Sequence, residues 1–246
     1  MSPDHFIITG TSKGIGEQLA QLLLDEGHYV HGIARNESNL LAHHERYHHF
    51  TYDLGHTSGL ETLMESILTP MDLSQSKMVC LINNAGMVEP LKRIESCDSQ
   101  QIELNVQIGL IAPMILSSSF IRYTSRFSLR KKIINISSGS GSHPAPGMSS
   151  YCSSKAGLNM FTQCVGLEQS AAPYPVEMIA VSPGMVETDM QRTARAQDVQ
   201  EFEMAAAFQQ AHDTGYLLST EEIGSHLMGM IKAEYRSGEV MDYNQG

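Results

Sequence analysis

The sequence predicts an α/β fold in which one doubly wound parallel sheet of about seven strands carries helices on both faces. Three observations support this prediction. Strand-like runs alternate with helical segments along all 246 residues. A glycine-rich turn separates the first strand from the first helix, as in nucleotide-binding sheets of this class. No repeat, linker or change of composition marks a second unit, so residues 1–246 are expected to form a single domain.

Seven runs have the composition of strands, because β-branched, aromatic and aliphatic residues dominate them. The fourth is apolar almost throughout, as expected of a strand covered on both faces. In chain order they are residues 6–9, 29–34, 49–52, 78–82, 133–136, 177–181 and 239–241.

Helices are expected where apolar residues recur every three or four positions. The first begins near Ile15 and ends at Gly27, and the second, 58–68, stops before Pro70. Segment 100–123 is expected to be one helix kinked at Pro113. Further helices are expected at 151–169 and 221–232, and the polar, Met-rich stretch 185–218 between strand and helix is interpreted as a substrate lid.

Composition excludes several function classes. A net charge of −11 and a pI near 5.4 argue against nucleic-acid binding, which requires a basic face. The short basic run 130–132 is interpreted as a solvated entry to a strand. No apolar stretch is expected to reach the ~20 residues that cross a bilayer, and no N-terminal leader is recognised. The four cysteines have no paired spacing and are expected to be reduced, which predicts a soluble cytoplasmic protein.

The glycine-rich turn predicts a phosphate-binding site. Glycines allow a pyrophosphate to approach the backbone, and the following helix offers free N–H groups and a partial positive charge. The spacing differs from the usual G-x-G-x-x-G, and such a string is also compatible with a simple connecting loop. The residues expected to bind the dinucleotide here are Gly10, Ser12, Lys13, Gly14, Ile15 and Gly16.

The end of the second strand indicates which dinucleotide is preferred. A carboxylate there would hold the ribose hydroxyls of NAD and repel the 2′-phosphate of NADP. This strand ends in Ala34-Arg35-Asn36, and two cations, Arg35 and Lys13, are expected to converge on a 2′-phosphate. NADP(H) is therefore the predicted cofactor, with Asn36, Asp53 and Leu54 near its adenosine end. The alternative for Arg35 and for Asp53 is a solvated loop charge, and for Asp53 the two interpretations are nearly balanced.

Three side chains predict acid–base chemistry at the carboxyl edge of the sheet. Tyr151 and Lys155 are four residues apart at the start of a helix and share one face. A phenol with a pKa near 10 becomes useful at neutral pH if a nearby ammonium stabilises its phenolate. Ser138 lies just past the fifth strand and could donate to a carbonyl oxygen. A Tyr-x-x-x-Lys pair alone is common, and its combination with the glycine turn and the serine makes it informative.

The chain resembles the short-chain dehydrogenases/reductases over nearly its whole length. Residues 9–16 resemble that family's T-G-x-x-x-G-x-G turn, 83–86 its N-N-A-G segment, and Ser138, Tyr151 and Lys155 have its serine–tyrosine–lysine spacing. The resemblance implies a Rossmann fold, a catalytic Asn105 that holds a water near the lysine, and a homodimer or homotetramer built on the two long helices. It also implies cofactor contacts from Asn84, Ala85, Gly86, Tyr151, Lys155, Pro183, Gly184, Val186 and Thr188.

Two stretches, 110–116 and 151–164, are most similar to bacterial benzil reductases and the related sepiapterin reductases. This similarity implies NADPH-dependent reduction of a small-molecule carbonyl, with benzil to (S)-benzoin as the characteristic reaction. Substrate contacts are expected from Ser138, Gly139, Tyr151 and Met185, with 140–148, Val186, Val88 and Glu89 around them. Alternatives are a sepiapterin reductase-like or 3-oxoacyl reductase activity, or a non-catalytic NADP(H) sensor. The histidines at 43, 44, 48 and 49 lack a ligand pattern, and no metal is predicted.

Overall fold

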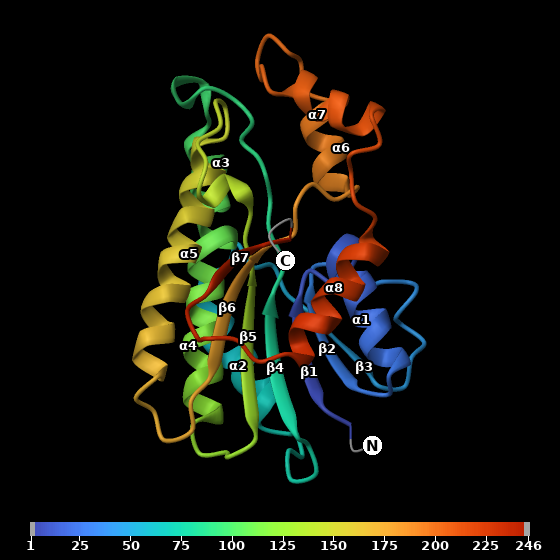
Figure 1. Ribbon diagram of the computed structural model, residues 1–246, viewed down its shortest axis with the longest axis vertical. Helices are drawn as coiled ribbons and strands as arrows, with labels where there is room; N and C mark the ends of the chain where they lie inside the picture. Colours follow the sequence, from blue (N-terminus) through green and yellow to red (C-terminus); the bar gives the residue numbers. More distant parts are fainter. Residues whose placement is uncertain (1–2, 244–246) are drawn as a thin grey trace.

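A seven-stranded parallel sheet runs through the centre of the molecule (Figure 1). The computed structural model describes residues 3–243, and every neighbouring pair of strands in it is parallel, in the order β3-β2-β1-β4-β5-β6-β7. This arrangement confirms the predicted fold class. The order reverses between β1 and β4, and sheets of this kind bind ligands at the carboxyl ends of the strands beside such a reversal. The strands are β1 (His5–Thr9), β2 (Tyr29–Ala34), β3 (Tyr47–Thr51), β4 (Met78–Asn83), β5 (Arg130–Ile136), β6 (Glu177–Ser182) and β7 (Val240–Asp242).

Helices cover both faces of the sheet because successive strand residues point to opposite sides. In β1, Phe6 and Ile8 join the apolar core beneath α1 and α8, whereas Ile7 joins the core beneath α2, α4 and α5. The helices are α1 (Gly14–Asp25), α2 (Leu60–Leu68), α3 (Ser99–Val106), α4 (Ala112–Thr124), α5 (Ser149–Gln169), α6 (Asp189–Arg195), α7 (Ala205–Asp213) and α8 (Thr220–Lys232). Figure 1 shows α6 and α7 projecting beyond the carboxyl edge of the sheet.

The segment around Pro113 is not one kinked helix. The α-helix stops at Val106, a π-helical stretch η3 (Gln107–Ile111) follows, and α4 begins with Pro113 in its first turn. Proline has no N–H to donate and is tolerated at a helix start. The irregularity therefore lies one turn before the proline, where the apolar pattern of the sequence shows no break.

The long helical segment corrects the expectation that no stretch could cross a bilayer. By length and composition Ser99–Thr124 would suffice, with a mean hydropathy of 1.6 over 18 residues, of which 44% are buried. Here α4 packs on α2 and on strands β4 and β5. The apolar composition thus belongs to a core helix.

The basic run is also corrected: it forms the start of β5, and two of its three residues, Lys131 and Lys132, are buried. Lys131 is 2% exposed, and its Nζ donates to the carbonyls of Thr124, Phe127 and Tyr174. Lys132 is fully buried and donates to the last carbonyls of α8 and to Glu177. Burial lowers the pKa of both ammonium groups. The two lysines donate hydrogen bonds to backbone carbonyls at or near the ends of helices that lie beside β5. Only the tertiary structure shows these contacts.

Three histidines stack on one face of the sheet near the start of its strands. The rings of His5 and His31 lie 5.5 Å apart and those of His31 and His48 5.2 Å apart, with a 3.2 Å hydrogen bond between His5 Nδ1 and His31 Nε2. Burial lowers the pKa of His31 to about 3, and the neighbouring His5 and His48 contribute to this shift. Burial also lowers the pKa of His5, although Asp4 and Asp72 oppose this.

This cluster predicts loss of stability in acid. Unfolded His31 takes up a proton below pH 6.5, whereas folded His31 stays neutral down to about pH 3. The free energy of unfolding therefore falls as the pH drops through this window, by on the order of 2 kcal/mol at pH 5 from His31 alone. Urea unfolding at pH 7.5 and 5 measures the loss. His31→Phe should flatten the dependence and the exposed His43→Gln should leave it unchanged; equal slopes for all three proteins would contradict this account.

Candidate active site

The turn between β1 and α1 is shaped by contacts that allow only glycine. Gly10 and Gly14 have φ of +78° and +65°, which favour glycine. A Cβ on Gly16 would lie 2.3 Å from the Gly10 carbonyl oxygen and 2.5 Å from Asn84 Nδ2. Lys13 at the N-cap of α1 makes no side-chain cap, so the first N–H groups of the helix are directed at the turn. The predicted phosphate-binding residues therefore lie in a tight turn at the uncapped start of α1.

Two further segments lie against this turn. Asn84 Nδ2 donates to the Thr9 carbonyl at 2.9 Å, while the backbone N–H groups of Asn84 and Ala85 donate to Thr9 Oγ1. On the other side, a Cβ on Gly14 would lie 3.6 Å from Thr188 Cγ2. The predicted segments 83–86 and 183–188 therefore both border the turn.

The residues expected near the adenosine end are spread over two strand ends. Arg35 and Asn36 are exposed directly after β2. Asp53 accepts the Gly55 N–H at 3.0 Å, and the neighbouring Leu54 is 7% exposed, packed in the core. Lys13 Nζ lies 2.5 Å from Asp189 Oδ2, an ion pair between the glycine turn and α6 that the sequence pattern did not indicate.

The residues of the predicted acid–base group come together where the carboxyl end of β5 meets the first turns of α5. Lys155 is 4% exposed; its Nζ donates to the Ile136 carbonyl at 2.8 Å and lies 5.7 Å from the centre of the Tyr151 ring. Ser138 follows β5 as the N-cap of the short helix η4 (Gly139–Gly141) and accepts the Ser140 N–H. A Cβ on Gly86 would lie 3.7 Å from Lys155 Nζ, so the N-N-A-G segment reaches the lysine.

The pKa values differ from the sequence-based expectation. Burial raises the pKa of Tyr151 above its ordinary value, and the nearby Ser138 hydroxyl lowers it only in part. Burial lowers the pKa of Lys155 to about 8. In this structure burial outweighs the expected lowering of the phenol pKa, and the Lys155 ammonium donates to the Ile136 carbonyl. At neutral pH the phenol holds its proton and most copies of the Lys155 side chain remain charged.

Asn105 is fully engaged by the protein. Its side chain is 1% exposed, and Nδ2 donates to the carbonyls of Met87 and Glu89 at 3.1 and 2.7 Å. Its Oδ1 accepts the Ser154 hydroxyl at 2.9 Å. Asn105 thus joins the end of α3 to the segment after β4 and to helix α5, at the residue before Lys155.

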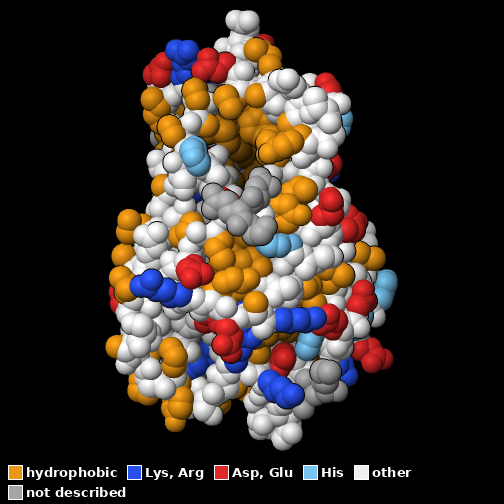
Figure 2. Space-filling model, in the orientation of Figure 1, with side chains coloured by type: hydrophobic (Ala, Val, Ile, Leu, Met, Phe, Trp, Pro, Cys, Tyr) orange, Lys and Arg blue, Asp and Glu red, His pale blue; other side chains and the backbone are white. Residues whose placement is uncertain are grey.

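The predicted lid is a structured insert that covers the tyrosine. It contains α6 and α7, and its base is closed by two backbone hydrogen bonds: Glu187 N–H donates to the Leu218 carbonyl, and Leu218 N–H donates to the Met185 carbonyl. Apolar residues of the insert pack with residues of the sheet edge around Tyr151, which is 8% exposed. This cluster consists of Val88, Leu91, Met148, Tyr151, Ala194, Phe202 and Ala205. Figure 2 shows a hollow lined by hydrophobic side chains between the side carrying α6 and α7 and the side carrying α3 and the start of α5.

Among the other expected substrate contacts, Gly139 and Met185 are half-buried, whereas Val186 packs in the core beneath α8. Phe202 is the main residue that the sequence analysis missed. It is 1% exposed, and a Cβ on Gly147 would lie 2.8 Å from its ring. An isolated phenylalanine in a polar stretch gives no indication that it packs in the same apolar cluster as Tyr151.

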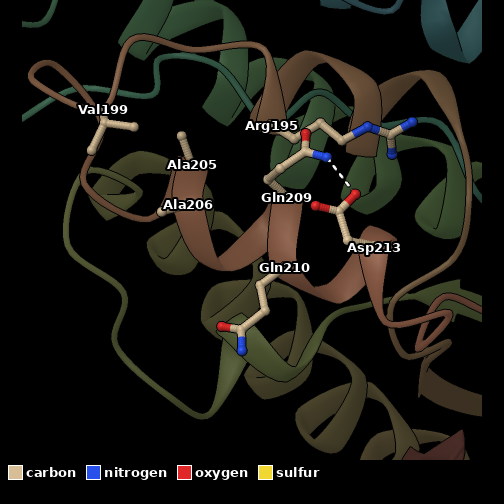
Figure 3. A pocket seen from close by; sticks show the side chains of 7 residues that line it. All are labelled: Arg195, Val199, Ala205, Ala206, Gln209, Gln210 and Asp213. Carbon is tan, nitrogen blue, oxygen red and sulfur yellow. Dashed lines mark hydrogen bonds between the residues drawn. The ribbon is translucent and has the colours of Figure 1, made fainter.

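A separate groove lies on the insert itself (Figure 3). Its volume is about 460 Å³, and none of its lining residues is a predicted site residue. Arg195 on its wall is paired with Glu187, and Gln209 donates to Asp213 at 2.7 Å. The groove therefore offers no acid–base group comparable with that at Tyr151.

Comparison with known proteins agrees with this geometry. The family model described as short chain dehydrogenase matches residues 4–199. The chain is 40% identical to benzil reductase ((S)-benzoin forming) of Bacillus cereus, over 96% of this chain and 98% of that protein. It is 35% identical to the Bacillus subtilis (strain 168) protein of the same name, over 98% of each.

A solved structure shares the fold. The YIR035C short chain dehydrogenase/reductase of Saccharomyces cerevisiae superposes with a TM-score of 0.83 at 23% identity, over 98% of this chain and 96% of that one. Sequence and fold lead to the same assignment. The chain belongs to the short-chain dehydrogenase family and is an oxidoreductase of that family.

Proposed function

We propose that this oxidoreductase, a carbonyl reductase of the short-chain type, uses NADPH to reduce α-diketones, with benzil to (S)-benzoin as its model reaction. The proposal depends on one observation: Tyr151, Lys155 and Ser138 meet at the carboxyl edge, beside a glycine turn that suits a pyrophosphate. The names of the two Bacillus relatives support the choice of substrate.

The described residues fit a dinucleotide. The uncapped start of α1 would hold the pyrophosphate, and Gly10, Gly14 and Gly16 leave its approach open. Lys155 and Tyr151 would hold the nicotinamide end, since Lys155 lies beside Gly86 of the N-N-A-G segment and close to the Tyr151 ring. When bound, the reduced nicotinamide supplies the hydride for the carbonyl carbon.

The chain's own residues manage the proton. Ser138 and Tyr151 donate hydrogen bonds to the carbonyl oxygen and orient it. As the C=O bond accepts the electron pair, the Tyr151 O–H bond breaks and its proton forms the new alcohol O–H. Lys155, largely protonated because its pKa is about 8, stabilises the resulting phenolate. The insert excludes water from the reacting group by packing over Tyr151.

In this proposal Arg35 is the main determinant of the preference for NADPH, and Lys13, which pairs with Asp189 in the structure, is the second cation. Replacing Arg35 with Leu should raise KM for NADPH by ~10- to 100-fold, as expected for one charge-assisted pair, and leave KM for NADH unchanged. Steady-state kinetics with both cofactors measure the difference. Arg93→Leu, another exposed arginine, is the control. An Arg35 variant that still favours NADPH as strongly as the wild type would refute this role.

The substrate class is tested by NADPH absorbance with benzil, a simple diketone, sepiapterin and a 3-oxoacyl thioester. We expect benzil to be consumed fastest and chiral chromatography to show (S)-benzoin. Fastest turnover of sepiapterin or the thioester would reassign the substrate. Tight NADPH binding with no turnover of any compound would indicate a nucleotide sensor.

We propose that the protein is cytoplasmic and assembles as a homodimer or homotetramer through α4 and α5. Large apolar side chains on these helices are exposed, among them Met114 (39%), Met160 (59%) and Leu167 (67%). Apolar helix faces of this kind pair with a second copy in many homo-oligomers. Light scattering measures the mass, and Leu167→Glu should shift it towards the monomer.

A further inference from the structure

We propose that Ser137 and Asn159 form a positioning pair that holds Ser138 in register with Tyr151 during catalysis. The inference rests on the proposed carbonyl reduction. Ser137 Oγ donates to Asn159 Oδ1 at 2.6 Å, and the two side chains are 3% and 7% exposed. Neither residue belongs to the acid–base group itself.

The pair completes a regular set of contacts between the end of β5 and one face of α5. Tyr151, Lys155 and Asn159 follow one another at four-residue intervals, so all three side chains lie on that face. Three consecutive residues oppose them: the Ile136 carbonyl accepts from Lys155, Ser137 donates to Asn159, and Ser138 lies beside the Tyr151 hydroxyl. Two of these contacts involve Lys155 or Tyr151. The contact between Ser137 and Asn159 involves neither.

Packing around the pair leaves little freedom. The short helix η4 lies flat on α5, because Gly141 has no side chain. A Cβ on Gly141 would lie 2.7 Å from Asn159 Nδ2 and 3.1 Å from the Lys155 carbonyl oxygen. The Ser137 N–H also donates to the Val181 carbonyl at 2.7 Å, which fixes its backbone to β6. Ser137 is therefore anchored at its backbone to the sheet and at its side chain to α5.

The two anchors of Ser137 restrict the position of Ser138, because Ser138 is the next residue in the chain and is itself only half-buried. Without the side-chain bond, the strand end could shift relative to α5, and the serine and phenol would no longer meet on one carbonyl oxygen. Misplacement of a reacting group by ~1 Å can cost about 100-fold in rate. NADPH binding depends on other contacts, and the Ser138 hydrogen bond strengthens mainly as charge develops on the carbonyl oxygen, so both KM and the NADPH Kd should be preserved.

The test compares single and double variants. Ser137→Ala and Asn159→Leu should each lower kcat for the best ketone about 10- to 100-fold, with KM and the NADPH Kd within about 2-fold of wild type. The double variant should be no slower than the slower single variant, because both changes break the same bond. Ser137→Thr, which keeps the hydroxyl, should recover kcat to within about 3-fold of wild type.

Thr162→Val is the matched control. Its Oγ1 accepts from Asn135 at 2.8 Å, a buried bond between the same strand and helix, further along α5 from Tyr151. This variant should lower Tm but not kcat. Unchanged kcat in Ser137→Ala and Asn159→Leu, or an equal loss in Thr162→Val, would overturn the positioning role. NADPH binding by fluorescence establishes that each variant is folded, and a wild type inactive on every ketone would refute the proposed function together with the pair.

Discussion

Tyr151→Phe is expected to lower kcat for ketone reduction by ~10³- to 10⁴-fold, because it removes the proton donor and leaves the packing intact. The ring remains in the apolar cluster formed with the insert, so stability should change little. The Kd for NADPH should stay within a few-fold of wild type, since the glycine turn is untouched. Stopped-flow or steady-state NADPH oxidation measures the rate, and fluorescence titration measures the affinity.

Tyr174→Phe is the matched control for this change. Tyr174 is 48% exposed and lies between α5 and β6, far along the chain from the acid–base group. Its variant should reduce ketones at the wild-type rate. If Tyr151→Phe kept normal turnover, another group would have to donate the proton, and the assignment of Tyr151 would be wrong.

Gly16→Ala is expected to abolish measurable NADPH binding and to destabilise the fold by about 1–3 kcal/mol. The added Cβ would lie 2.3 Å from the Gly10 carbonyl oxygen, a backbone atom that can move only if the turn moves. That movement would also break the Asn84 contacts that tie the turn to the end of β4. Thermal unfolding and fluorescence titration measure the two effects.

Gly229→Ala is the control for this second change. Gly229 is exposed on α8, and a Cβ added there would meet no atom of the described residues within 4 Å beyond its own helix backbone. Alanine at this position should therefore be neutral or stabilise the fold by ~0.5–1 kcal/mol. The same substitution thus has opposite expected signs at two helical glycines. A Gly16→Ala protein that bound NADPH normally would show that the turn does not hold the nucleotide.

The sequence alone determined the fold class and the edge of the sheet at which the proposed acid–base residues lie. Alternation of strands and helices is a local property, because the pattern of apolar residues dictates which face of each element is buried. Parallel strands then bring all their carboxyl ends to one edge, so Gly10, Ser138 and Tyr151 had to meet there. The spacing of Tyr151 and Lys155 on one helix face also follows from local geometry.

Only the tertiary structure decided the properties that depend on distant partners. The pKa of Tyr151 is raised because the insert and sheet edge bury the phenol, while Lys155 is directed at the Ile136 carbonyl. Lys131 and Lys132 look like surface residues in the sequence, yet they are buried because free carbonyl groups from distant helix ends lie within their reach. The same holds for Phe202. Burial and electrostatic environment are sums over residues far apart in the chain, whereas sequence patterns report mainly on neighbours.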